Sequence, residues 1–206
     1  MKRIRIILWG LVLFAVVGIV VAKVMLPTRP RPQQPEQPES GKLFAVPPIT
    51  LTDQDAKGFS TAQLLGRPWV ADFIFTSCPG SCPIMSHQME ELQKKTPAAL
   101  ALVSFSVDPE HDTPAILKEY GQGLHADFSR WHFLTGTHQQ MVDAARDMKI
   151  SVHPADKDFA LSHSDKLLLV DQTGNVVGVY DGTSSMDLDR LVADATKLAH
   201  KGANAS

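Results

Sequence analysis

One stretch, residues 69–85, limits what this chain can fold into more than any other. It begins with an apolar run, residues 70–75, rich in residues that favour a β-strand, with Asp72 as its single charged member. The chain's two cysteines, Cys78 and Cys82, follow directly. A helical pattern begins at the next residue. Both sulfur atoms are therefore predicted to lie at a junction between a buried strand and a helix.

The cysteine spacing leaves two kinds of chemistry open. A purely structural disulfide would close a very small loop, which stabilises little, and a domain of this length needs no such staple. A helix N-terminus favours negative charge, so we expect the thiolate to form easily there. Thiolates attack disulfides, and they also bind soft metal ions such as Cu(I); zinc usually takes four ligands, and the chain has no further cysteine.

A copper site would need a third ligand, and the chain offers eight histidines. His87 lies one turn after the cysteines, on the polar side of the expected helix. His153 and His163 flank a long connection, residues 151–165, that precedes an apolar strand. Taken alone, each is an ordinary surface histidine, so the residues themselves leave the choice of ligand open. Met85 and Met89 could donate sulfur, but their helical spacing favours packing in the core.

The N-terminal region differs in character from the rest. Residues 6–22 carry no charge, and we interpret residues 1–26 as a transmembrane anchor rather than a cleaved signal peptide, because the apolar run is long and the cleavage pattern weak. Basic residues stand on both sides of this span, so the charge rule barely indicates an orientation. Residues 27–41 are rich in proline and polar residues, which is typical of an extended linker.

The remaining chain has the length of one domain, residues 42–200, followed by a short tail that we expect to be flexible, residues 201–206. Strands alternate with helices, among them a helix from Pro114 that Gly121 is expected to end, and a hairpin near residues 166–180 comes before the last helix. This order predicts an α/β fold of the thioredoxin-like type, with a mixed central sheet and helices on both faces. The formal net charge is −2 with no basic stripe, so nothing indicates nucleic-acid binding.

Three motifs, taken in order, resemble one known family. They read FIFTSCPGSCP at residues 73–83, DPEHDTP at residues 108–114 and SHSDKLLLVDQTGNVVGVYDG at residues 162–182. Together they resemble the Sco/SenC family of membrane-anchored copper proteins that help assemble cytochrome c oxidase. The similarity extends over residues 43–198.

The resemblance implies a thioredoxin-like domain on the periplasmic side of a bacterial cytoplasmic membrane, held there by a single-pass anchor. It also implies a copper site, for Cu(I) or Cu(II), formed by Cys78, Cys82 and His163, and so selects His163 over His153. We interpret the second motif as structural. The acidic residue that the family usually has two positions before the histidine is absent here, where Leu161 stands.

The function implied is that of a copper metallochaperone. It would deliver copper to the dinuclear copper centre of cytochrome c oxidase subunit II, or prepare the cysteines of that centre, with other copper chaperones or thiol reductants as further partners. No catalytic residue is predicted beyond the redox-active pair Cys78 and Cys82. The alternatives are an extracytoplasmic thiol-disulfide oxidoreductase or peroxidase-like protein that uses the same pair, and a copper sensor or buffer.

Overall fold

A computed structural model describes residues 41–153 and 162–203. The predicted anchor, residues 1–26, and all but the last residue of the predicted linker lie outside the described residues. Within the described part, none of the helices combines the length and the apolar character that crossing a membrane requires.

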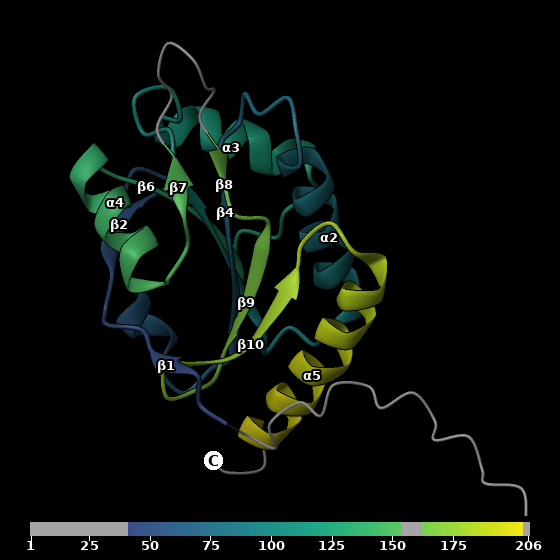
Figure 1. Ribbon diagram of the computed structural model, residues 1–206. Helices are drawn as coiled ribbons and strands as arrows, with labels where there is room; N and C mark the ends of the chain where they lie inside the picture. The colour runs from purple at the N-terminus through teal and green to yellow at the C-terminus, as the bar shows by residue number, and fades with distance from the viewer. Residues whose placement is uncertain (1–40, 154–161, 204–206) are drawn as a thin grey trace, which may run out of the picture. The chain divides into compact units, whose positions relative to one another are not determined.

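The centre of the fold is an eight-stranded sheet in the order β1-β10-β9-β4-β5-β6-β2-β3 (Figure 1). A separate two-stranded ribbon pairs β7 with β8. The strands are β1 (Phe44–Ala45), β2 (Thr50–Asp53), β3 (Gly58–Ser60), β4 (Trp69–Ile74), β5 (Ala101–Ser106), β6 (Trp131–Thr135), β7 (Val152–His153), β8 (Ser162–His163), β9 (Lys166–Val170) and β10 (Asn175–Asp181).

The two middle strands are the most deeply buried elements. Every residue of β4 and of β5 is buried, because helices cover both faces of the sheet at this point. β4 pairs in parallel with β5, and β5 in parallel with β6, whereas β9 runs antiparallel to β4. The sheet is therefore mixed, as the sequence predicts.

Helices lie on both sides of the sheet, which confirms the predicted layers (Figure 1). The apolar stripes of α2 (Cys82–Lys95), α3 (Pro114–Gly123) and α5 (Ser185–Ala203) pack on one face with Val70 and Ile74. On the other face, α4 (His138–Asp147) and the short 3-10 helix η1 (Thr61–Leu64) pack with Ala71 and Phe73. α5 ends at Ala203, three residues beyond the predicted end of the domain at residue 200.

One helix end differs from its prediction. Gly121 does not end α3, which continues to Gly123. A side chain at position 121 would begin only 2.7 Å from the ring of Phe128 and 2.8 Å from that of Phe133. The glycine thus serves the close packing of two aromatic rings and does not mark a turn.

The strand directions bring the three sequence motifs to one edge of the sheet. β4 and β5 are parallel, so both end at the same edge, and the cysteine motif and the DPEHDTP motif follow them there. β9 is antiparallel to β4, with Trp69 opposite Val170 and Ala71 opposite Leu168, so β9 begins at that edge. The segment with His163 lies directly before β9 and therefore meets the cysteine motif.

Candidate metal centre

The cysteines occupy different environments at this edge. Cys78 is half-buried in the loop after β4, where its backbone N–H donates to the carbonyl of Phe75 at 3.2 Å. Cys82 is the first residue of α2 and is 1% exposed. Both are free thiols. One sulfur can thus be reached from solvent, while the other lies under the loop.

His163 lies against the buried cysteine. Its Nε2 atom is 3.1 Å from Cys82 Sγ, although the two residues are 81 positions apart in the sequence. The imidazole also contacts the ring of Phe75 edge-on, with 6.0 Å between the ring centroids. β8 carries His163 opposite Val152 of β7, whereas His153 is exposed. The structure therefore brings together two of the three residues that the resemblance groups, Cys82 and His163, and leaves His153 outside.

The hydrogen bonds of His163 define which ring nitrogen is free. Nδ1 lies 3.2 Å from the carbonyl oxygen of Ser164. Because a carbonyl can only accept a hydrogen bond, Nδ1 carries the proton of the neutral ring, and the lone pair of Nε2 faces Cys82. Burial lowers the pKa of His163, which favours this neutral form. A neutral imidazole with this lone pair can accept the hydrogen of the Cys82 thiol, and the same lone pair is what a metal ligand requires.

The electrostatics of Cys82 differ from the sequence-based expectation. The N-terminus of α2 was expected to favour the thiolate, but burial raises the pKa of the Cys82 thiol, and the neighbouring Cys78 thiol raises it further. Loss of water around the sulfur therefore outweighs the helix N-terminus. Burial therefore favours the neutral thiol of Cys82 over its thiolate.

The geometry of Cys82 and His163 can accept a metal ion with a small adjustment. Bonds of about 2.3 Å to sulfur and 2.0 Å to nitrogen at a near-tetrahedral angle separate the two ligand atoms by about 3.5 Å. The observed 3.1 Å is close to this value. Within residues 41–153 and 162–203, however, no three His, Cys, Asp or Glu side chains are already grouped closely enough to hold a metal ion. A site that also uses Cys78 would therefore need these three side chains to draw closer together.

A contact between the cysteine and histidine segments was missed from the sequence. Ser81, between the two cysteines, makes no capping bond to α2, and its hydroxyl instead hydrogen-bonds to the carboxylate of Asp165. The backbone of Asp165 also accepts from Gly182 N–H at 2.9 Å. Asp165 lies two residues after His163 and belongs to the third motif. No local pattern in the sequence, however, indicates that its partner is Ser81.

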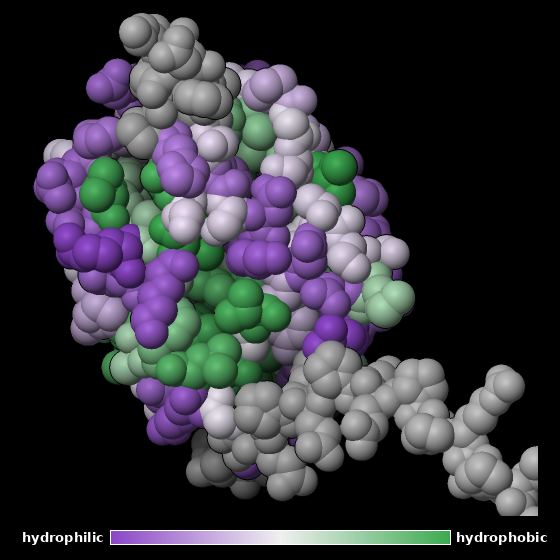
Figure 2. Space-filling view, viewed as in Figure 1, coloured by the Kyte–Doolittle hydropathy of each residue, from purple (hydrophilic) through white to green (hydrophobic). Residues whose placement is uncertain are grey.

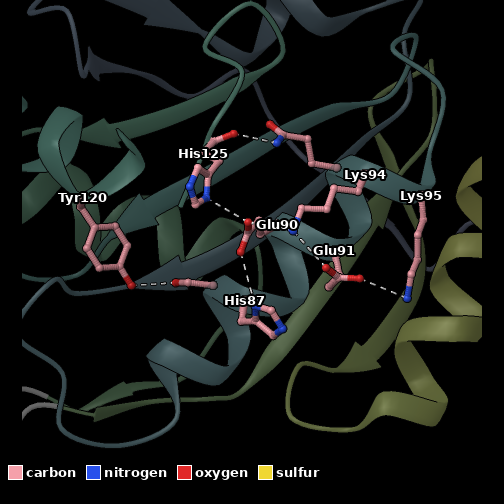
Figure 3. A network of polar contacts seen from close by, with 9 residues as sticks. His87, Glu90, Glu91, Lys94, Lys95, Tyr120 and His125 are labelled. Atoms are coloured by element: carbon pink, nitrogen blue, oxygen red, sulfur yellow. Dashed lines mark hydrogen bonds and ion pairs between the residues drawn. The ribbon is translucent and has the colours of Figure 1, made fainter. Parts of the chain in front are cut away.

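The other histidine near the cysteines in sequence is engaged elsewhere. His87 Nδ1 lies 3.3 Å from Glu90 on the outer face of α2, and His125 Nδ1 lies 3.1 Å from the same carboxylate. Lys94 completes this polar network at 2.9 Å (Figure 3). His87 is therefore a surface residue, as its position in the helical pattern predicts.

A buried acid lies under α2. Asp72 in β4 is fully buried on the face that packs against α2 and α3. Neither of its oxygens has a hydrogen-bond partner of good geometry among the described residues. Ser104 lies opposite Asp72 in β5, and its hydroxyl accepts a hydrogen bond from Trp131 Nε1 at 3.0 Å. Burial raises the pKa of Asp72 to about 7. The sequence marks Asp72 as unusual but does not reveal this isolation.

A small, mostly apolar cavity lies at the opposite edge of the sheet. It is lined by Val46, Leu65, Trp69 and Gly174, among others. Figure 2 shows apolar residues gathered on the lower part of the viewed face, near β1 and β10.

The family assignment follows from the whole domain. The sequence model of the SCO1/SenC family matches residues 37–200, which include all three motifs. The chain belongs to the SCO1/SenC family. The SCO1 protein homolog of Bacillus subtilis is 36% identical over 156 residues, covering 73% of this chain and 81% of the relative.

Solved structures of Sco proteins share the fold. BsSco, a member of the Sco family of cytochrome c oxidase assembly proteins in which a disulfide switch was identified, superposes with a TM-score of 0.69 at 33% identity, covering 79% of this chain and 98% of that one. Arabidopsis thaliana ScoI, solved with copper bound, gives a TM-score of 0.65 at 25% identity, covering 76% and 99%. The thioredoxin-like α/β fold expected from the sequence is therefore confirmed.

Proposed function

We propose that this SCO1/SenC protein is a copper metallochaperone that binds its cargo through Cys78, Cys82 and His163. The observation that supports this most strongly is the 3.1 Å approach of His163 Nε2 to Cys82 Sγ. The neutral imidazole and the two thiols form a soft donor set, which suits Cu(I). The copper-bound structures of Sco relatives support the same choice of metal.

Loading would exchange protons for metal. Cys78 and Cys82 each give up a thiol proton to solvent as their sulfurs bind the ion, while His163 contributes the Nε2 lone pair and stays neutral. The positive ion compensates the buried charge that a free Cys82 thiolate would carry. Cu(II) is the second oxidation state to consider for the same ligands.

Release would be controlled by the redox state of the cysteines. In the copper-loaded protein both sulfurs are thiolates, so exchange with the disulfide of a partner protein would transfer two electrons to that disulfide, whose sulfurs take two protons from solvent, and a Cys78–Cys82 disulfide would form. The sulfurs of a disulfide no longer act as thiolate ligands, so the metal leaves. The disulfide switch described for BsSco supports this part of the proposal.

The setting of the protein belongs to the same proposal. Residues 1–26 would anchor it in the bacterial cytoplasmic membrane, and the proline-rich residues 27–41 would hold the domain on the periplasmic side. Its acceptor would be the dinuclear copper centre of cytochrome c oxidase subunit II, with other copper chaperones or thiol reductants as further partners. The relation of BsSco to cytochrome c oxidase assembly supports this choice of pathway.

A second candidate function is thiol-disulfide exchange itself. Two free thiols, one of them half-buried beside an exposed loop, are what such an oxidoreductase requires. In that case the cysteines would turn over, and His163 would not be needed as a ligand.

The variants His163→Ala and His153→Ala distinguish the two functions. For the reduced full chain in detergent, titrated with Cu(I) against a competing chelator under nitrogen, we expect His163→Ala to weaken copper binding by roughly 100-fold, since a ligand is lost. His153→Ala should bind as the parent does, because His153 is exposed in the same ribbon. If His163→Ala keeps the parental copper affinity and changes only the rate of disulfide reduction, the oxidoreductase is the correct function.

A further inference from the structure

The DPEHDTP motif contains a carboxylate that is fully buried at the edge of the sheet. Asp112 is 0% exposed. Its Oδ1 accepts the hydroxyl hydrogen of Thr76 at 2.6 Å, and its Oδ2 accepts that of Ser106 at 2.6 Å. The backbone N–H of Thr76 lies 3.3 and 3.2 Å from the two oxygens. None of the ion pairs among the described residues includes Asp112, so hydrogen bonds are what hold this group in the protein interior.

These bonds join three segments. Thr76 follows the end of β4, Ser106 is the last residue of β5, and Asp112 directly precedes Thr113, which caps the N-terminus of α3. The backbone N–H of Asp112 donates to the carbonyl of Asp108 at 2.8 Å, which closes the motif on itself. The carboxylate thus acts as a common acceptor for the loops after both central strands.

Thr76 is also part of the turn that carries Cys78. The Cys78 N–H donates to the Phe75 carbonyl at 3.2 Å, so residues 75–78 form a turn with Thr76 in its second position. The Asp112 carboxylate holds Thr76 by both its backbone and its side chain. Fixing Thr76 therefore fixes the direction in which the chain leaves the sheet toward Cys78.

We propose that Asp112 is a positioning residue for the copper site, which acts through Thr76 to place Cys78 within reach of the Cys82–His163 pair. The inference rests on the proposed function. An amide is a poor replacement for the carboxylate, because its NH₂ group would require the hydroxyl of Ser106 or Thr76 to turn and accept, and the negative charge that strengthens these hydrogen bonds would be lost. The role goes beyond capping α3, since Thr113 already supplies the cap, with its side chain accepting from Ile116 N–H.

The chain offers a matched control at the opposite edge. Asp171, in the turn between β9 and β10, likewise accepts several hydrogen bonds, from Thr173 N–H at 2.9 Å, the Thr173 hydroxyl at 2.8 Å and Asn175 N–H at 2.9 Å. Asp171 directly follows Val170, the last residue of β9, and Val170 pairs with Trp69 at the start of β4, away from the cysteines. All three bonds go to Oδ1, which an amide oxygen can replace, so Asp171→Asn removes the negative charge of a hydrogen-bonded turn without touching the cysteine loop.

The test compares Asp112→Asn and Asp171→Asn in the full chain by two readouts: Cu(I) affinity of the reduced protein, and the dithiol–disulfide equilibrium of Cys78 and Cys82 against a glutathione buffer. We expect Asp112→Asn to lower copper affinity by roughly 10-fold or more and to shift the dithiol–disulfide equilibrium, and Asp171→Asn to leave both unchanged. Thr76→Val, which loses one donor at nearly constant shape, should show part of the effect, and Thr76→Ser should restore the parental values. The Thr76 variants decide the question if Asp112→Asn does not fold.

The outcomes separate the two proposals. If Asp112→Asn or Thr76→Val keeps the parental copper affinity and the parental dithiol–disulfide equilibrium, the positioning role is wrong. Loss of copper binding in His163→Ala would still support the proposed function. If the parent itself does not bind copper, the proposed function is wrong. The dithiol–disulfide equilibrium then decides whether Asp112 positions Cys78. Equal losses in Asp112→Asn and Asp171→Asn would show a general structural effect and would also overturn the role.

Discussion

Serine in place of Cys78 or Cys82 is expected to abolish tight copper binding, and the Cys82 substitution is also expected to destabilise the fold. A neutral hydroxyl is a poor ligand for a soft cation, so either change removes an essential donor. Cys78 is half-buried in a loop, and its replacement should change the free energy of unfolding by no more than about 0.5 kcal/mol. Cys82 is buried, and a more polar group there should cost about 1–3 kcal/mol.

The two variants serve as controls for each other. Copper binding is measured by Cu(I) competition and by the thiolate-to-copper absorption bands of the reduced full chain, and stability by urea unfolding without metal. Loss of copper in Cys78→Ser at unchanged stability separates the ligand role from the fold. Tight binding that survives in either variant would contradict a site built on both sulfurs.

The second large effect concerns Asp72 and pH. The pKa of this carboxyl is about 7 in the folded chain because of burial, compared with an ordinary value of 3.8. At a pH below the ordinary value, both states hold the proton, and Asp72 adds no pH dependence to stability. As pH rises from about 4 to 7, the unfolded chain loses the proton while the folded chain retains it, so stability falls. Above pH 7 the full penalty applies, roughly 4 kcal/mol for a shift of this size.

Comparison of the parent with Asp72→Asn isolates this contribution. The variant should gain stability relative to the parent as pH rises, with the largest difference at about pH 8, when urea unfolding is measured across the range. Asp127→Asn is the control of opposite sign, because hydrogen bonds from Ser129 lower the pKa of Asp127 and its loss should matter more at high pH than at low pH. A pH-independent difference between parent and Asp72→Asn would show that Asp72 is not a buried, isolated acid.

Local patterns in the sequence were sufficient to predict the elements that carry the cysteines. The apolar run that forms β4 and the Met85, Met89 and Leu92 stripe of α2 are short-range signals, and both elements form where expected. Gly121 misled the prediction because its reason is a contact with Phe128 and Phe133, which no local pattern encodes.

The site could be predicted only in part, for a similar reason. Cys78 and Cys82 stand out in the sequence, but His163 was selected through the resemblance to Sco proteins and not by its own surroundings. Its proximity to Cys82 follows from the antiparallel pairing of β4 with β9, a long-range property of the sheet. The contacts of Asp165 and Asp112 depend on the same arrangement of loops. The raised pKa of Cys82 depends on burial, which spacing in the sequence does not measure.

X-ray absorption at the copper edge of the reduced, copper-loaded full chain tests the central claim most directly. Convergence of Cys78, Cys82 and His163 on one ion predicts two sulfur neighbours and one imidazole nitrogen, and the imidazole signal should disappear in His163→Ala but persist in His153→Ala. A spectrum without imidazole in the parent, or an imidazole signal unchanged in His163→Ala, would contradict the account.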